Sequence, residues 1–383
     1  MNSIFAFIIF LTIFHTLYGL FHFYFYRKLL RALDMGTLSH VMLIIVLCFL
    51  LFSMIIIYNL MNTELFLLTK VIAYIGYIWM GVLFLFFSVN ILIDIYKLII
   101  HISSRIFSPL LLKGLPVDKN ILIASLLIVT GITVYGWFEA NHMRVERMTL
   151  KTAKLPTQVS TLRIVHISDT HFSPTNGLRL AKKITGIIED LQPDILVSSG
   201  DLIDRGFQSR EKVTELFSGI KTTYGKYTVL GNHDEIAETV EFTEKAGFRL
   251  LRNKNVTMGN FLNIAGIDDP AAGTIGNPDY APEHEILKAF SSEHLNIFLK
   301  HQPRIEHESI GKFDIQLSSH THGGQIFPFS LIVSLFYPYF EGLYEVGNDS
   351  YLYVSRGTGT WGPPIRFLAP PEITVIDFQS LQP

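Results

Sequence analysis

The stretch Leu162-Arg-Ile-Val-His-Ile-Ser-Asp-Thr-His171 decides how the second half of this chain folds. Residues 162–167 are an apolar, β-branched run that predicts a buried strand, and the polar Asp169 and His171 follow it directly. Side chains at positions i and i+2 converge on one point only when the backbone turns just after the strand. Taken alone, such a motif is weak, because loop aspartates and histidines usually have structural roles.

The same arrangement recurs four times further along the chain. The motifs read Gly200-Asp201-Leu-Ile-Asp204-Arg205, Gly231-Asn232-His233-Asp234, Lys300-His301 and Ser319-His320-Thr-His322. With the first motif they supply seven oxygen or imidazole ligands, namely Asp169, His171, Asp201, Asn232, His301, His320 and His322. Two adjacent divalent metals that share one carboxylate and leave positions open for substrate need such a set. The pattern predicts a two-metal phosphoesterase site.

Each motif also has an ordinary explanation. Asp201 alone is compatible with a helix N-cap or a loop aspartate, and Gly231-Asn232-His233-Asp234 is turn-forming by composition. The combination of all motifs in order favours the metal site.

Strand-like runs alternate with helical segments after residue 160, which predicts an α/β core with the motifs on loops past the strand ends. The strand runs are 162–167, 195–198, 227–230, 262–267, 296–299, 315–317, 352–354 and 373–376, and the helix candidates are 178–191, 209–220 and 236–246.

The first part of the chain has a different composition. Mean hydropathy is +0.35, only 17% of residues are charged, and the formal net charge is −2. These values indicate a membrane protein and give no support for nucleic-acid binding. Residues 3–26, 38–62, 71–93 and 121–138 are apolar and approach the ~20 residues that a membrane-spanning helix needs. The sequence therefore predicts a four-span transmembrane region at 1–138, a linker at 139–160 and a catalytic domain at 161–383.

Lysine and arginine fall mainly in two of the connectors between these spans. Positive charge marks cytoplasmic loops, so both chain ends are expected outside, with the catalytic domain extracytoplasmic and the plasma membrane as its location. The basic residues are Arg27, Lys28 and Arg31 after the first span, and Lys97, Arg105, Lys113 and Lys119 after the third, against Lys70 alone between the second and third. The one cysteine, Cys48, excludes an intrachain disulfide and zinc held by several thiolates.

The motifs resemble those of the calcineurin-like metallophosphoesterase superfamily, whose pattern is D-x-H, G-D-x-x-D, G-N-H-[DE], a lone His and G-H-x-H. The resemblance covers residues 160–380 and implies two mixed sheets packed face to face and flanked by helices. Three further segments resemble the bacterial membrane-associated branch, and some vertebrate membrane proteins are arranged similarly. These segments are Gly266-Ile-Asp-Asp-Pro270, Gly323-Gly-Gln325 and the C-terminal part from Tyr353 to Ile373 with Arg356 and Arg366. One position departs from the family pattern, because Ser319 stands where the last motif usually has glycine.

The resemblance also implies a role for each ligand. Asp169, His171 and His322 would hold one metal, Asn232, His301 and His320 would hold the other, and Asp201 would bridge them. His233 would protonate the leaving oxygen, with Asp234 holding its other ring nitrogen. Arg205 resembles a phosphate-contacting arginine, although a solvated loop arginine explains it equally well. Manganese, iron and zinc all suit these donors.

Attack by a metal-bridging hydroxide on a phosphoester is the mechanism expected from this site. A phosphodiester or a pyrophosphate-linked lipid is the expected substrate, because residues 326–340 are apolar, uncharged and interrupted by prolines. This segment is too short to span a bilayer, and either core packing or an interfacial lid beside the metals would explain it.

Two alternatives compete with the enzyme hypothesis. One is a catalytically silent membrane receptor or scaffold that binds a phosphorylated ligand, and the other is a four-span transporter with a regulatory domain. All seven ligands and His233 are present, which favours an enzyme. The predicted spans contain only scattered histidines as ionisable groups, which favours anchoring over transport. Oligomeric state, exact substrate, metal identity and source kingdom are left open by the sequence.

Overall fold

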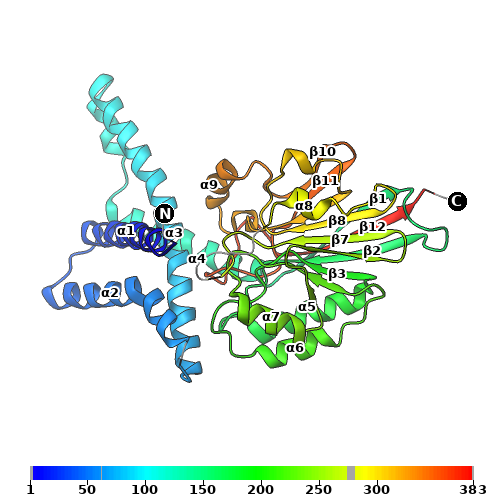
Figure 1. The fold of residues 1–383 in the computed structure, drawn as a ribbon. Helices are drawn as coiled ribbons and strands as arrows, with labels where there is room; N and C mark the ends of the chain where they lie inside the picture. Colours follow the sequence, from blue (N-terminus) through cyan, green and yellow to red (C-terminus); the bar gives the residue numbers. More distant parts are fainter. Residues whose placement is uncertain (1–2, 62, 274–280, 382–383) are drawn as a thin grey trace. The chain divides into compact units, whose positions relative to one another are not determined.

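The chain folds into two compact units, residues 1–138 and 139–383. The computed structural model describes residues 3–61, 63–273 and 281–381. The first unit is helical, and the second contains two β-sheets with flanking helices (Figure 1).

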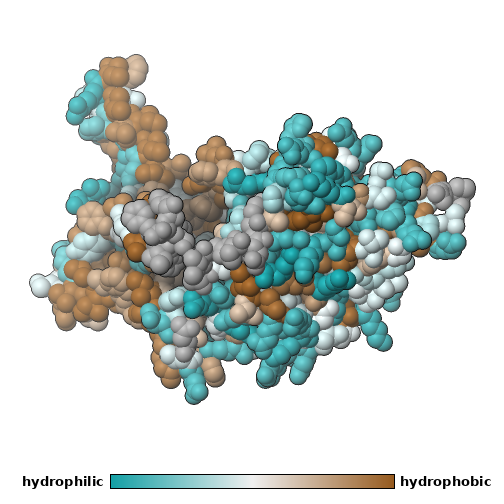
Figure 2. Space-filling model, viewed as in Figure 1, coloured by the Kyte–Doolittle hydropathy of each residue, from teal (hydrophilic) through white to brown (hydrophobic). Residues whose placement is uncertain are grey.

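Apolar helices make up the first unit. They are α1 (Ser3–Ala32), α2 (Thr37–Leu60), α3 (Phe66–Ile106), a short 3-10 helix (Pro109–Gly114) and α4 (Asp118–Ala140), whose last residues belong to the second unit. Hydrophobic residues dominate the visible surface of this unit, whereas hydrophilic residues dominate that of the second (Figure 2). Exposure of this apolar surface to water would be energetically unfavourable, so the surface indicates a membrane environment.

Three of the helices in the described part of the chain, α2, α3 and α4, are long and apolar enough to cross a membrane. The prediction of four spans therefore needs correction to three candidates. Residues 3–26 do lie in helix α1, but the side chains of residues 1–7 and 10 lie outside the described part. From residue 11 onward α1 is rich in histidine, tyrosine and basic residues, which lowers its hydropathy.

Helix α3 is much longer than the span predicted at 71–93. Its 41 residues correspond to about 60 Å at ~1.5 Å per residue, roughly twice the ~30 Å of a hydrocarbon core. The last turns carry Lys97, His101 and Arg105. A charged end of this kind is suited to extend beyond the hydrocarbon region.

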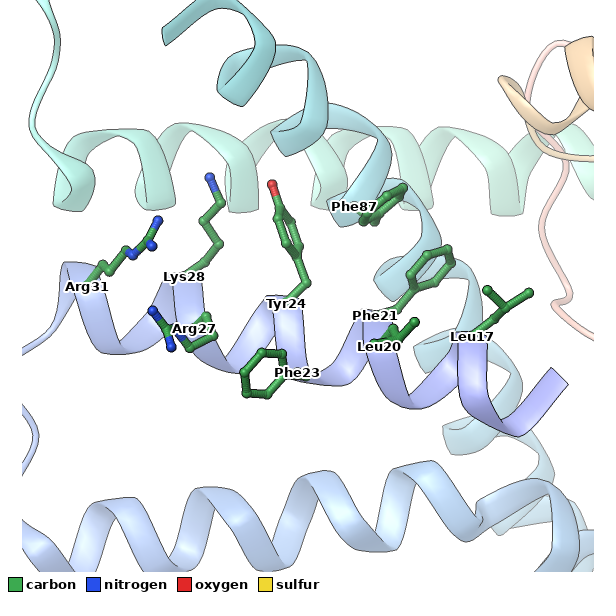
Figure 3. A pocket seen from close by; sticks show the side chains of 9 residues that line it. All are labelled: Leu17, Leu20, Phe21, Phe23, Tyr24, Arg27, Lys28, Arg31 and Phe87. Carbon is green, nitrogen blue, oxygen red and sulfur yellow. The ribbon is translucent and has the colours of Figure 1, made fainter. Parts of the chain in front are cut away.

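Helices α1 and α3 border a pocket of about 680 Å³ in the first unit (Figure 3). Its lining is apolar except at one end, where Arg27, Lys28 and Arg31 lie. Lys28 pairs with Asp94 of α3, and Tyr24 donates a hydrogen bond to the same carboxylate. Asp94 lies just beyond the predicted span 71–93, where a charged side chain can reach the membrane surface.

The second unit contains two six-stranded mixed sheets, which confirms the predicted α/β fold. The first sheet has the order β1-β12-β2-β3-β4-β5 and the second β10-β11-β9-β8-β7-β6. Strands of the first sheet are β1 (Arg144–Thr152), β2 (Thr161–Ile167), β3 (Ile195–Ser198), β4 (Lys226–Thr228), β5 (Arg249–Leu250) and β12 (Glu372–Ser380). Those of the second are β6 (Lys254–Met258), β7 (Leu262–Ile267), β8 (Leu295–Lys300), β9 (Ile315–Ser318), β10 (Gly342–Gly347) and β11 (Ser350–Val354).

The two sheets share a hydrophobic core between their facing surfaces. Ile164 and Val197 of the first sheet belong to the same buried cluster as Ile297 and Leu317 of the second. Three helices cover the outer face of the first sheet, namely α5 (Gly177–Leu191), α6 (Arg210–Ser218) and α7 (Ile236–Lys245) (Figure 1). The short helix α8 (Glu283–Leu287) packs against the outer face of the second sheet. The central strands are thus buried on both faces, which explains their continuous apolar sequence.

Residues 139–160 do not form a free linker, contrary to the prediction. Strand β1 lies within them and pairs in parallel with β12 at the other end of the chain, from Arg144 opposite Glu372 to Thr152 opposite Ser380. Because β1 is an edge strand with one exposed face, its many charged residues resemble those of a linker. Only residues 141–143 connect α4 to this strand.

Candidate metal centre

The predicted ligands come from both sheets. Parallel strands deliver their carboxyl ends to one edge of a sheet. Asp169 and His171 follow β2, Asp201 follows β3 and Asn232 follows β4, all in the first sheet, whereas His301 follows β8 and His320 and His322 follow β9 in the second. The structure brings all seven together where these strand ends meet.

One group consists of Asp169, His171 and His322, whose ligand atoms lie within 4.8 Å of one another. The Nε2 atoms of His171 and His322 are 3.3 Å apart, and Nε2 of His322 lies 3.5 Å from Oδ1 of Asp169. Two imidazole nitrogens and a carboxylate oxygen at this spacing can bind one divalent cation.

The second group consists of Asn232, His301 and His320. Oδ1 of Asn232 lies 2.9 Å from Nε2 of His301 and 2.8 Å from Nδ1 of His320. The two histidine nitrogens are 3.2 Å apart. These three donors therefore also face a common point.

Asp201 lies between the two groups. Its Oδ2 is 3.7 Å from Nε2 of His171 and 3.3 Å from Nε2 of His301. Asp169 reaches toward the second group as well, because its ligand atom lies within 4.8 Å of those of Asp201 and His301. One carboxylate within reach of both groups is the geometry needed for a bridging ligand.

The backbone at these loops is strained. Asp169, His171, Asp201, His320 and His322 all have positive φ, between 41° and 75°. Such conformations are uncommon for residues other than glycine and each costs about 1–3 kcal/mol. Their concentration at the candidate ligands indicates that the surrounding fold holds them in place for a functional reason.

Two glycines allow these loops to approach closely. A Cβ on Gly231 would lie 2.2 Å from Oδ1 of Asp201, and one on Gly200 would lie 2.6 Å from the backbone nitrogen of Gly231. Gly200 also has φ of 105°, which favours glycine. The glycines of both motifs are therefore explained by packing at the site.

Burial and the neighbouring charges both shift the pKa values of groups at the site. Burial opposes ionisation of Asp201, but the neighbouring His301, His233 and His171 hold its pKa well below the usual value. Burial lowers the pKa of His171, yet Asp204, Asp201 and Asp169 together raise it to about 9. The carboxylates thus favour positive charge near His171, which divalent cations would supply.

The donors present fit metal ions. Asp169 is fully buried, and among the described residues no group donates a hydrogen bond to its Oδ1. A buried carboxylate oxygen without a donor is costly unless a cation occupies its place. Asp201 and Asn232 contribute oxygen and the four histidines contribute nitrogen, a set that suits manganese, iron or zinc.

Other groups orient the candidate histidine ligands through their second ring nitrogen. Nδ1 of His171 lies 2.8 Å from Oδ1 of Asp204, and Nδ1 of His301 lies 2.9 Å from the carbonyl oxygen of Ser199. Nε2 of His320 lies 2.8 Å from the hydroxyl of Tyr337. Contacts of this kind fix the orientation of a metal-binding imidazole.

Asp234 does not hold the His233 ring, contrary to the prediction. Its Oδ2 accepts hydrogen bonds from the backbone nitrogens of Asp201 and Gly231, both at 2.8 Å. Buried at the base of the loops, the carboxylate connects two motifs through their main chains. Asp234 is therefore better described as a positioning residue.

His233 and Arg205 are both exposed, and His233 borders the ligand groups. The His233 ring stands between Trp361 and His171, with ring centroids 5.2 and 5.4 Å away. Its backbone nitrogen donates to Oδ1 of Asp201. Arg205 is exposed on the loop between β3 and α6. Their catalytic and phosphate-binding roles stay predictions.

The contacts of Ser319 explain why a serine can replace the glycine of the family pattern. Its backbone is not among those with positive φ, and its buried hydroxyl accepts a hydrogen bond from Ser199 at 2.9 Å. Oγ of Ser319 also lies 3.4 Å from Nδ1 of His301, and Ser199 in turn lies 2.9 Å from Nε2 of His166. His166 therefore belongs to a buried chain of polar groups behind the site.

The C-terminal segment stabilises the His322 loop through contacts that the motifs did not reveal. Arg366 is fully buried, and its guanidinium donates to the carbonyl oxygens of Gly359, Ala369 and His322. Burial lowers its pKa to about 10, which leaves it charged at neutral pH. Gln325 similarly bonds both the nitrogen and the carbonyl of Trp361. Two of the three segments that resemble the bacterial branch, Gly323–Gln325 and the C-terminal part, thus pack around the His322 loop.

This architecture, two facing mixed sheets with aspartates, histidines and an asparagine gathered at the strand ends, defines a metallophosphoesterase domain. Residues 162–324 match the family profile of calcineurin-like phosphoesterases. An uncharacterized metallophosphoesterase from Aquifex aeolicus is 35% identical over 250 residues, which are 64% of this chain and 95% of that protein. The chain belongs to the calcineurin-like phosphoesterase family.

Two further relatives bear on the first unit. One matches nearly the whole chain, and the other is named as a transmembrane protein. An uncharacterized metallophosphoesterase from Campylobacter jejuni is 28% identical over 98% of this chain and 99% of its own length. A protein from Danio rerio named transmembrane protein with metallophosphoesterase domain is 31% identical over 66% of this chain and 62% of that protein. Family membership supports metal-dependent phosphoester hydrolysis, and the apolar helices suggest membrane association.

Proposed function

We propose that this protein is a membrane-anchored hydrolase that cleaves a phosphodiester or a pyrophosphate-linked substrate with the help of two divalent metal ions. The position of Asp201 carries the proposal, because its Oδ2 lies within 3.7 Å of histidine nitrogens from both groups. Asp169, His171 and His322 would hold one ion, Asn232, His301 and His320 the other, and Asp201 would contact both.

The metal ions would lower the pKa of bound water and absorb negative charge from the phosphoryl oxygens. The residues of the chain supply the rest of the chemistry. Hydrolysis forms a bond from water oxygen to phosphorus and breaks the bond to the leaving oxygen. His233, on the exposed side of the site, would donate a proton to that leaving oxygen. Arg205 would contact a phosphate oxygen.

Charge distribution supports an extracytoplasmic catalytic unit. The segment before α2 carries Arg27, Lys28 and Arg31, and the segment from the end of α3 to α4 carries further basic residues. If both basic segments lie in the cytoplasm, α4 crosses the membrane from the cytoplasmic to the outer side. This holds whether or not α1 crosses the membrane. A reporter fused after residue 383 tests this orientation, and activity of a cytoplasm-only reporter would contradict it.

Hydrolysis assays with matched variants test the enzymatic proposal. The full-length protein is expected to cleave a bis-aryl phosphate diester faster than the corresponding monoester when divalent metal is present. Asp201→Ala and His322→Ala should abolish turnover, whereas His307→Ala, an exposed histidine in the 3-10 helix His307–Ser309, should retain it. Near wild-type turnover by either site variant would refute the proposal.

The same assay separates an enzyme from a silent receptor. A receptor that uses the phosphoesterase fold to bind a phosphorylated ligand would bind such a ligand and show no turnover with any added metal. All candidate ligand positions are filled by metal-binding side chains, which supports the enzyme.

A further inference from the structure

Helix α9 (Phe329–Phe336) presents an unusual apolar surface directly after the His322 loop. None of its residues is buried. Leu335 is 82% exposed, Phe336 70% and Leu331 59%, and residues 326–340 carry no charge. Hydrophobic residues are seen over α9 in Figure 2. Core packing, one of the two explanations left open by the sequence, does not apply to this helix.

The helix is attached firmly to the metal centre at both ends. At its start, Gly324 packs so closely that a Cβ there would lie 2.3 Å from Cα of Ser330. At its end, the hydroxyl of Tyr337 contacts Nε2 of His320 at 2.8 Å. Thr321 donates to the carbonyl oxygen of Phe340. The exposed apolar face is therefore held at a fixed place beside the candidate ligands.

Three observations favour lipid as the occupant of this face. The same chain carries three helices suited to span a membrane, and only residues 141–143 separate the last of them from β1. The apolar helix is too short to span a bilayer itself. Its C-terminal side carries the aromatic residues Tyr337 and Tyr339, and the guanidinium of Arg304 lies 5.4 Å from the Tyr337 ring centroid.

An apolar face bordered by tyrosine and arginine matches the boundary between acyl chains and phosphate headgroups. We infer that α9 is an interfacial lipid-binding surface on which the hydrocarbon tail of a lipid-linked phosphodiester or pyrophosphate rests while its phosphorus reaches the metal centre. This inference rests on the proposed function for its second part, the identity of the substrate. Arg304 would then contact the phosphate group of the lipid.

Fluorescence quenching in nanodiscs tests the lipid contact without reference to catalysis. Full-length protein with Cys48→Ser receives one new cysteine, Leu335→Cys, and an environment-sensitive fluorophore. Leu381→Cys is the matched control, because it is 60% exposed and follows β12, whose C-terminal end pairs with the start of β2 and so lies at the edge opposite the metal centre. Brominated phosphatidylcholine should quench the label at 335 and leave the label at 381 unchanged. Equal, low quenching at both positions would overturn the inference.

Two diesters with the same leaving group test the substrate. Phosphatidyl-p-nitrophenol in nanodiscs has a lipid tail, whereas bis(p-nitrophenyl) phosphate is soluble in water. Leu335→Glu should lower turnover of the lipid diester about tenfold more than turnover of the soluble one. The reason is that a glutamate replaces the leucine that would contact the hydrocarbon tail of the lipid. Leu381→Glu should leave the ratio of the two rates unchanged.

The two experiments fail separately. If the wild-type protein cleaves neither diester, the proposed function is refuted, and the quenching result still decides whether α9 contacts lipid. If both diesters are cleaved and Leu335→Glu affects them equally, the substrate part of the inference is wrong and the hydrolase proposal stands.

Discussion

Gly231→Ala is the sharpest test of how the loops hold the metal centre. An added Cβ would lie 2.2 Å from Oδ1, 2.7 Å from Cγ and 2.7 Å from the backbone nitrogen of Asp201. Carbon and oxygen atoms do not approach closer than about 3 Å without repulsion, so the carboxylate has to retreat by about 1 Å. Gly231 is not among the glycines with positive φ. The effect of the substitution is therefore steric and falls on Asp201, whose carboxylate and backbone nitrogen would both lie too close to the added Cβ.

A displacement of about 1 Å at a reacting group can lower turnover about 10²-fold. We expect Gly231→Ala to lose at least this much activity toward a bis-aryl phosphate diester and to bind less metal, because Asp201 can no longer serve both groups. The assay combines initial rates at saturating metal with metal content per chain. Circular dichroism and thermal unfolding of the same preparation check that the fold is retained.

Gly186→Ala provides the matched control. Gly186 lies in α5, and a Cβ there would meet nothing within 4 Å. Alanine in a helix is more favourable than glycine by about 1 kcal/mol, so this variant should be as active as wild type and slightly more stable. Wild-type turnover and full metal content in Gly231→Ala would refute the argument that this glycine sets the position of Asp201.

Three further predictions concern the groups behind the site. Ser319→Ala removes the hydroxyl near Nδ1 of His301 and should weaken metal binding about tenfold; a metal titration that gives wild-type affinity would contradict this. Arg366→Lys leaves buried carbonyl oxygens without donors and should cost about 3 kcal/mol, seen as a midpoint of thermal unfolding lowered by roughly 10 °C; an unchanged midpoint would show that Arg366 is not needed for stability. Burial lowers the pKa of His166 to about 3, whereas an unfolded histidine has a pKa of ~6.5. Since the unfolded state then binds more protons, His166 should make the protein less stable as the pH falls from ~6.5 toward ~3. His166→Gln should lose this part of the acid dependence in chelator-treated protein, and an acid dependence identical to wild type would be incompatible with a buried neutral His166.

Much of the catalytic fold could be predicted from the sequence, because its core elements have strong local patterns. The predicted helices 178–191 and 236–246 agree with α5 and α7 within one residue at each end. The motif residues could be expected to converge because each follows the carboxyl end of a strand in an α/β sheet. Their exact distances depend on the loops, which the pattern does not fix.

Features that depend on distant contacts could not be predicted. Strand β1 is charged and half-exposed, and only its pairing with β12, more than 200 residues later, makes it a strand. The role of Asp234 depends on which backbone nitrogens lie near it in space. Arg366 would be expected on the surface, since buried arginine requires several acceptors, and those acceptors come from loops that the sequence does not place.

Single polar residues were also ambiguous. His166 precedes Asp169 by three positions and lies on strand β2, where alternation alone cannot distinguish a core histidine from one in a polar network. The departure from glycine at Ser319 is a signal in the sequence that could have pointed to this network. The structure links the two residues through Ser199.

Metal content of the purified full-length protein, compared between wild type and Asp201→Ala, tests the central claim most directly. The geometry around Oδ2 of Asp201 predicts about two divalent ions per wild-type chain after metal loading and dialysis. Asp201→Ala should retain fewer ions and no activity while its fold is kept. A wild-type chain that binds no divalent metal, or an Asp201→Ala chain that keeps both ions and full turnover, would contradict the account.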